Sequence, residues 1–213
     1  MNGRWIRLVA MGLLSAGLVG CSDDDGGGGG LKNNDPGGND LNVVVTFGDS
    51  LTQGNYCSCP SYPSRLAGMI GKAVYNTGVS GSMASENIER TQGAIDRFHP
   101  AFMLILYGYN DIVHSFGVSS TIEALDQMVE ICKENHVVPV LATYPEPIGD
   151  HAAYAPTVLV LNSKIRALAN THGISCVDLQ PEFANSTTLL EDDGLHPNDA
   201  GTQVMAISFA ELF

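Results

Sequence analysis

Basic residues are scarce in this chain of 213 residues: ten Lys and Arg stand against 23 Asp and Glu, a formal net charge of −13 at pH 7. A protein that binds nucleic acid neutralises phosphates with clustered Lys and Arg. The balance therefore argues against nucleic acid as a partner. It also makes anionic polymers poor substrates.

Hydrophobic runs long enough to cross a bilayer are absent beyond the first 20 residues, since a spanning helix needs about 20 apolar residues. Internal repeats are absent too. Cys57 and Cys59 have no second cysteine-rich or histidine-rich pair to accompany them, which argues against a zinc site. What remains, residues 41–213, has enough aliphatic content for one domain with its own core.

The N-terminus has the features of a secretory signal. Arg4 and Arg7 flank the start of an apolar segment, residues 8–19, that is too short to span a bilayer comfortably. The segment leads into LVGC at residues 18–21, which resembles the lipobox of bacterial lipoproteins. This resemblance implies cleavage before Cys21, a lipid on its thiol, and a lipid-anchored location in the bacterial cell envelope.

A predicted flexible tether follows the lipobox. Beyond Cys21 the chain to residue 40 consists of Ser, Asp, Gly, Asn, Pro and Lys with a single leucine. Such a composition cannot bury enough apolar surface to offset its ordering entropy. The sequence thus predicts a lipoprotein signal peptide over residues 1–20, a lipidated tether over 21–40 and a folded domain over 41–213.

Five cysteines are present, of which Cys21 is accounted for by the lipid. Disulfides persist outside the cytoplasm, so Cys57 and Cys59 could form a small bridge, and the sequence leaves this open. Cys132 and Cys176 lie in apolar patterns and are expected to be buried thiols.

Short aliphatic or β-branched runs alternate five times with segments of helical periodicity. Strands are predicted over residues 42–47, 73–77, 102–107, 137–143 and 174–178, and helices over 61–71, 84–97, 120–135, 156–172 and 198–212. Residues 102–106 are apolar throughout, as expected where helices cover both faces of a parallel sheet. The predicted fold is an α/β, three-layer α/β/α domain with a five-stranded parallel sheet.

Three local signals support the predicted helices. Ser120 and Glu123 match a capping box, Gly173 follows the fourth helix as a stop signal, and Pro197 suits the first turn of the last helix.

Residues that could carry chemistry all follow predicted strands. They are Ser50, Gly78, Gly81, Asn110, Asp193 and His196. Ligands of open parallel sheets bind beyond the carboxyl ends of the strands. Because every candidate falls at that edge, the sequence predicts a single site there.

Ser50 is the predicted nucleophile, and a serine hydroxyl needs a neighbouring base to take its proton. His196 is the predicted base. Asp193, three residues earlier, can fix the imidazole tautomer and stabilise the imidazolium. His114 and His151 lie in loops and are expected to be exposed to solvent.

Nucleophilic attack on a carbonyl creates an oxyanion, which fixed donors stabilise. The candidates are the backbone N–H at Ser50, the backbone of Gly81, and the side-chain amide of Asn110. Gly81 could equally serve a tight turn and Asn110 a loop cap.

Four separated blocks resemble those of the SGNH, or GDSL, hydrolases: GDSL at residues 48–51, Gly81, GYND at 108–111 and DGLHP at 193–197. The resemblance spans nearly all of residues 41–213. It implies a flavodoxin-like α/β/α fold and an esterase or lipase that needs no metal or organic cofactor. By matching position, Ser50 would be the nucleophile, Gly81 and Asn110 oxyanion donors, His196 the base and Asp193 its orienting acid.

The resemblance leads us to expect hydrolysis of carboxylic esters through an acyl-serine intermediate, with acyl chains of short to medium length. Tyr109 stands where some members have a second glycine, and residues 55–60 look inserted. Both departures leave the substrate open among short esters, acetylated polysaccharide and lysophospholipid. The expected partners are an acyl ester and, through the lipid anchor, a membrane.

Three alternatives compete with this interpretation. Residues 46–52 could bind the phosphate of a flavin mononucleotide, although Asp49 would repel it. A surface glycan binder without catalytic activity could use the tyrosines near the predicted edge, namely Tyr107, Tyr109, Tyr144 and Tyr154. The other common serine-hydrolase elbow requires GxSxG, and the GVSGS at residues 78–82 lacks the final glycine.

Overall fold

The computed structural model describes residues 30–32, 35–184 and 186–213. The predicted signal peptide and Cys21 lie outside this part of the chain. None of the helices described here combines the length and the hydropathy that a membrane span requires.

Five parallel strands form one sheet in the order β2-β1-β3-β4-β5. They are β1 (Asp40–Gly48), β2 (Ala73–Asn76), β3 (Pro100–Leu106), β4 (Val138–Ala142) and β5 (Ser175–Val177). Each overlaps one of the predicted strands. The central strand β3 is buried at every residue, which explains why its sequence is apolar throughout.

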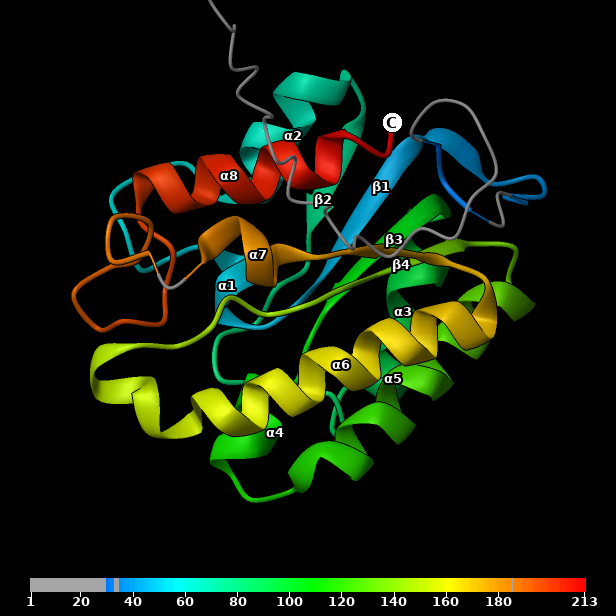
Figure 1. Ribbon diagram of the computed structural model, residues 1–213. Coiled ribbons are helices and arrows are strands. Elements are labelled where there is room, and N and C mark those ends of the chain that lie inside the picture. The colour runs from blue at the N-terminus through cyan, green and yellow to red at the C-terminus, as the bar shows by residue number, and fades with distance from the viewer. Residues whose placement is uncertain (1–29, 33–34, 185) are drawn as a thin grey trace, which may run out of the picture.

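Helices cover both faces of the sheet (Figure 1). They are α1 (Ser50–Gln53), α2 (Tyr62–Ile70), α3 (Ile88–Phe98), α4 (Tyr109–Val113), α5 (Gly117–Glu134), the 3₁₀ helix η1 (Gly149–Tyr154), α6 (Ala155–His172), α7 (Leu179–Phe183) and α8 (Asp199–Ala210). Figure 1 shows α2 and α8 on one side of the strands and α3, α5 and α6 on the other. The predicted three-layer α/β/α fold with a five-stranded parallel sheet is confirmed.

The order of the strands positions the site. The chain runs from β1 to the edge strand β2 and then crosses back to β3 on the other side of β1. Gly48 is paired with Leu106, so β1 and β3 end level with each other. The loops beyond these two strands diverge, which is where open α/β sheets bind ligands. Ser50 begins α1 and Asn110 lies in α4, both directly beyond these strand ends.

Two of the three predicted helix signals are wrong, namely the capping box at Ser120 and the placement of Pro197 in the first turn of α8. No capping box forms at Ser120, because α5 begins one turn earlier, at Gly117, and no side chain caps its first turn. Gly117 has a φ of 81°, which lets the chain turn sharply from α4 into α5. Asn198 caps α8 and Pro197 precedes it. Gly173 ends α6 with a φ of 64°, as predicted.

The described part of the predicted tether contacts the domain. Leu31 packs against the core, and the N–H of Lys32 donates to a serine hydroxyl of β5 at 2.9 Å. The Nδ2 of Asn39 donates to the carbonyl oxygens of residues 135 and 136, just beyond α5, at 2.9 and 2.8 Å. One leucine and one asparagine that precede residue 41 thus have partners on the domain.

Cys57 and Cys59 form a disulfide, with their Cα atoms 5.2 Å apart. Cys132 is a buried thiol, as expected, and its burial raises its pKa. Cys176 is only partly buried. Within the described residues, no group of three His, Cys, Asp or Glu side chains is placed to hold a metal ion.

Candidate active site

The structure brings Ser50, His196 and Asp193 together in one line of hydrogen bonds. The hydroxyl of Ser50 lies 3.0 Å from Nε2 of His196. Nδ1 of the same imidazole lies 2.5 Å from Oδ2 of Asp193. A carboxylate accepts only, so Nδ1 carries the proton and Nε2 is free to accept from the serine. The fold therefore brings Ser50 next to residues at least 143 positions later in the sequence, in the geometry that a serine nucleophile and its base require.

Asp193 is held as an anion. Its other oxygen, Oδ1, accepts the N–H groups of Leu195 and His196 at 2.9 and 3.0 Å. Burial raises the pKa of this carboxyl, but the hydrogen bonds from His196 and Leu195 outweigh that effect and lower the pKa below its ordinary value. Asp193 therefore faces the imidazole with its charge in place.

A second loop braces the segment that carries Asp193 and His196. The N–H of Ile148, beyond β4, donates to the carbonyl oxygen of Gly194 at 2.8 Å. A Cβ on Gly194 would lie 2.3 Å from the carbonyl oxygen of Ile148, and its φ is 75°. Only glycine fits both the conformation and the close approach. Gly194 thus allows the loop after β4 to support the acid and the base.

Ser50 is presented by the short helix α1. Asp49 precedes it and accepts the N–H of Leu51 at 3.0 Å, as an N-cap does. Only 6% of Ser50 and 7% of His196 is exposed. A proton passing between these two side chains would therefore be largely shielded from bulk water.

Asp49, next to Ser50, has partners that sequence reasoning did not identify. It is fully buried, and its Oδ2 accepts the hydroxyl of Tyr144 at 2.6 Å. Burial raises its pKa from 3.8 to about 6, although the hydrogen bonds from Tyr144 and Leu51 act against this. Asp49 and Tyr144 are 95 residues apart, so no local pattern could have paired them. The carboxyl lies beneath the nucleophile, which disfavours a phosphate-binding loop here.

Asn110 lies at the site with its amide already engaged. Its Nδ2 lies 3.0 Å from the carbonyl oxygen of Ser82 and 3.2 Å from Oδ2 of Asp49. Both N–H groups of the amide therefore have protein acceptors. The hydrogen bond to Asp49 is longer than the one to Ser82, and it leads toward Ser50, because Asp49 directly precedes that serine.

The backbone N–H groups of Gly81 and Ser50, unlike the side-chain amide of Asn110, are not engaged by protein acceptors among the described residues. Gly81 has a φ of 76° and open space where a Cβ would stand. Gly78, by contrast, is packed against α1: a Cβ there would lie 2.3 Å from the backbone nitrogen of Gln53. Gly78 thus brings the loop close to α1, and Gly81 leaves a donor exposed.

Asp111 organises the same loop from α4. Its carboxylate is fully buried and accepts the N–H groups of Ala84 and Ser85 at 2.9 and 3.2 Å. It also accepts the Ser85 hydroxyl at 3.1 Å. Since Asn110 and Asp111 are adjacent, one segment fixes both the amide and the loop that carries Gly81.

Three of the four tyrosines named for this edge are buried, and Tyr154 is partly buried. Tyr107 and Tyr144 are completely buried and Tyr109 is 3% exposed, so these rings offer no stacking platform for a glycan. The hydroxyl of Tyr109 lies 2.6 Å from Nδ1 of His151. The expectation that His151 is exposed to solvent is wrong, because Tyr109 holds it against α4.

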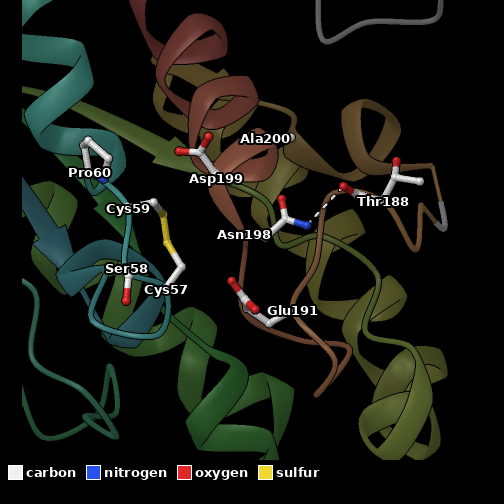
Figure 2. Close-up of a pocket in the computed structure, with 9 residues that line it drawn as sticks. All are labelled: Cys57, Ser58, Cys59, Pro60, Thr188, Glu191, Asn198, Asp199 and Ala200. Carbon is white, nitrogen blue, oxygen red and sulfur yellow. Dashed lines mark hydrogen bonds between the residues drawn. A yellow bond between two sulfur atoms is a disulfide. The ribbon is translucent and has the colours of Figure 1, made fainter.

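A groove of about 640 Å³ lies beside the loop of His196 (Figure 2). Figure 2 shows the Cys57–Cys59 disulfide on one side, with Glu191 and Asn198 opposite. The lining residues are Cys57, Ser58, Cys59, Pro60, Thr188, Glu191, Asn198, Asp199 and Ala200. The N–H of Glu191 donates to the carbonyl oxygen of His196 at 2.7 Å. No aromatic or long aliphatic side chain lines the groove.

A family model and several solved structures are similar to this chain. The model of the "GDSL-like Lipase/Acylhydrolase family" matches residues 46–204. This span contains Ser50, Gly81, Asn110, Asp193 and His196. No curated protein sequence matches the chain.

Several solved structures share the fold. A member of the lipolytic protein G-D-S-L family from Veillonella parvula has a TM-score of 0.70 and 19% identity, covering 80% of this chain and 97% of its own. A mutant of an acetyl-xylooligosaccharide esterase from Geobacillus has a TM-score of 0.67 and 17% identity, covering 83% and 94%. A carbohydrate esterase family 3 structure from Talaromyces cellulolyticus has a TM-score of 0.67 and 16% identity, covering 80% and 95%. At these identities the likeness establishes the fold alone.

Proposed function

This chain belongs to the GDSL-like lipase/acylhydrolase family, and from that premise we propose that it is a serine esterase that cleaves carboxylic esters through an acyl-serine intermediate. The observation that supports this most is the line of hydrogen bonds from Ser50 through His196 to Asp193. A nucleophile, a base and an orienting anion in this order are what acyl transfer requires.

In the first half-reaction, Oγ of Ser50 attacks the carbonyl carbon of the ester while its proton passes to Nε2 of His196. The carbonyl oxygen becomes an oxyanion, and Asp193 stabilises the imidazolium. Collapse of this intermediate breaks the bond to the alcohol, which leaves with the proton from Nε2. The acyl group remains on Ser50.

In the second half-reaction, water takes the place of the alcohol. His196 removes a proton from the water as it attacks the acyl carbon, and the second oxyanion collapses to release the carboxylic acid. The proton on Nε2 returns to Oγ of Ser50. The products are one alcohol and one acid, and the protein is regenerated.

The backbone N–H groups of Ser50 and Gly81 are the best-placed oxyanion donors, since neither has an acceptor in the described structure. Loss of one such donor typically costs about 10² to 10³ in rate. Asn110 would be the third donor, with the N–H that now makes the longer bond to Asp49 turned to the oxyanion.

We assign short acyl chains to the substrate. The structural neighbours described as an acetyl-xylooligosaccharide esterase and a carbohydrate esterase favour acetyl groups on a carbohydrate.

The proposal is tested with p-nitrophenyl esters of acetyl, butyryl, octanoyl and palmitoyl groups, together with acetylated xylan. We expect turnover to fall as the acyl chain lengthens and acetylated xylan to be cleaved. Ser50→Ala should abolish both turnover and labelling by a fluorophosphonate. Ser163→Ala, which replaces an exposed serine on α6, is the matched control. Labelling or turnover that survives in Ser50→Ala would refute the nucleophile, and faster palmitoyl cleavage would refute the short chain.

We also propose that the protein is anchored to a bacterial envelope membrane by a lipid on Cys21. The sequence at residues 18–21 supports this, and the Cys57–Cys59 disulfide fits a location outside the cytoplasm. Cys21→Ala should move the protein from the membrane fraction to the soluble fraction while kcat on the acetyl ester stays the same. A wild-type protein found only in the soluble fraction would refute the anchor.

A further inference from the structure

Tyr56 lies flat on the imidazole of His196. The two ring centroids are 3.4 Å apart and the ring planes differ by 3°. Tyr56 is nevertheless 49% exposed, so this contact is not a consequence of burial in the core. One face of the catalytic ring is therefore covered by an aromatic side chain from the surface.

The Tyr56 ring is held at both ends. Its hydroxyl lies 3.0 Å from the hydroxyl of Ser80, which directly precedes Gly81. The N–H of Ser80 in turn donates to Oε1 of Gln53 at 2.8 Å, at the end of α1. The ring thus spans from its own loop, across His196, to the loop of the expected oxyanion donor.

The backbone next to Tyr56 is also restrained. Cys57 follows directly and is closed onto Cys59 by the disulfide. Sγ of Cys59 lies 3.8 Å from the hydroxyl of Thr202 in α8, and Nε of Arg65 donates to the carbonyl oxygen of Pro60 at 3.2 Å. These contacts tie the short segment at residues 57–60 to α2 and α8, so Tyr56 is attached to a fixed support.

An aromatic face in this position does two things to the imidazole. It blocks rotation of the ring out of the plane that joins Ser50 to Asp193. It also presents negative π density to a ring that becomes positively charged when it takes the serine proton, and such cation–π contacts favour the charged form. The second effect is larger in the transition state than before attack, which is the condition for raising kcat.

We infer that Tyr56 is a positioning residue of the esterase, which holds His196 in the plane of proton transfer and stabilises its imidazolium during each half-reaction. This inference rests on the proposed function of the same site. Tyr56 does not exchange a proton itself, and it acts through the face of its ring rather than through its hydroxyl.

The experiment compares Tyr56→Leu and Tyr56→Phe with the wild-type chain on p-nitrophenyl acetate. Leucine removes the π face, so kcat should fall by about 3- to 30-fold with KM nearly unchanged. Phenylalanine keeps the face and loses only the bond to Ser80, so it should retain at least half of the wild-type kcat. The second-order rate of labelling by a fluorophosphonate should follow kcat in both variants.

Tyr75→Leu is the matched control, because Tyr75 lies on the edge strand β2, is 42% exposed and stacks on Phe98, not on His196, with centroids 4.5 Å apart. It should leave kcat unchanged. Tyr56→Met, which keeps side-chain length without a π face, repeats the test should the leucine variant fold poorly, and it should lose kcat as leucine does.

Three results would overturn the inference. Full kcat in Tyr56→Leu would show that the ring does not act on His196. An equal loss in the leucine and phenylalanine variants would assign the effect to the Ser80 hydrogen bond. A rise in KM alone would make Tyr56 a substrate contact. These results can be told apart from failure of the proposed function, because in that case the wild-type chain itself would cleave no ester.

Discussion

Asp49 and Asp193 lie at the same edge of the sheet and meet opposite environments. Asp49 is fully buried next to the nucleophile, and burial raises its pKa to about 6. Asp193 lies in the half-exposed loop of the base; burial raises its pKa, but hydrogen bonds from His196 and Leu195 bring it below its ordinary value. The comparison teaches that the number and charge of the surrounding groups, rather than residue type, decide the pH at which each carboxyl ionises.

The difference follows from the donors and charges around each carboxyl. Asp193 accepts two backbone N–H groups and faces an imidazole that becomes cationic. Asp49 accepts one backbone N–H and two neutral side chains, while the negative charge of Asp111 lies near enough to raise its pKa further. Asp193 is thus suited to act on the base, and Asp49 to support the nucleophile turn.

The largest effect is expected at Asp193. Asp193→Asn removes the charge that stabilises the imidazolium and leaves an amide that cannot hold the same tautomer. We expect kcat on p-nitrophenyl acetate to fall by about 10³- to 10⁴-fold with little change in stability. Asp192→Asn, an exposed neighbour, should keep wild-type kcat. A loss of kcat of less than 10-fold in Asp193→Asn would show that the charge of Asp193 does not act on His196, contrary to the contrast drawn between the two carboxyls.

Asp49→Asn should change the pH dependence of stability. The pKa of Asp49 is raised from 3.8 to about 6 in the folded protein, so its contribution to stability is fully present below pH 3.8 and is lost as pH rises through 6. The free energy of unfolding of the wild-type chain, relative to Asp49→Asn, should therefore fall by about 3 kcal/mol between pH 3.5 and 7.5.

Denaturant unfolding at several pH values measures this difference. Asp96→Asn, an exposed carboxyl on α3, is the control and should give a nearly constant difference over the same range. A difference for Asp49→Asn that is flat, or that grows with pH, would mean that the buried carboxyl is stabilised as an anion.

The smallest effect is expected at Tyr144. Tyr144→Phe removes the 2.6 Å hydrogen bond to Asp49, which acts to lower the pKa of that carboxyl. The free energy of unfolding at pH 7.5 should fall by about 1.5 to 3 kcal/mol, because the bond is to a charged group at that pH. At pH 3.5 the loss should be smaller.

Tyr62→Phe is the reference for this variant, because Tyr62 is also fully buried and its hydroxyl meets only the neutral Thr52, at 3.3 Å. Its effect should be about 1 kcal/mol and independent of pH in this range. Equal effects of the two substitutions at pH 7.5 would show that Asp49 is uncharged there.

The strands, and the placement of the expected site residues at one edge of the sheet, could be predicted because their signals are local. A continuous apolar run such as β3 is required of a strand covered on both faces, and Ser50, Asn110 and His196 each follow a strand. The helix starts were predicted less well. The first turn of α5 depends on the backbone conformation of Gly117, and α8 is capped by Asn198. Other residues of similar type lie nearby in the sequence, so the sequence alone did not show where each helix begins.

Other features required the folded chain. Leu31 and Asn39 look like parts of a polar tether until the surfaces they contact are known. In the sequence, Tyr56 belongs to a segment that looks inserted, and nothing there indicates a contact with His196. Only the structure places its ring on that imidazole. The engagement of the Asn110 amide by Ser82 and Asp49 likewise joins three separate segments.

By itself, the sequence determined the alternation of strands and helices, the parallel sheet they imply and the set of residues delivered to its carboxyl edge, because hydrophobic periodicity and short motifs act over a few residues. The tertiary structure decided which of those groups meet and in what charge state. Hydrogen bonds, burial and ring contacts between distant segments set the charge of Asp49 and Asp193 and the covering of His196, and such contacts exist only once the chain has packed.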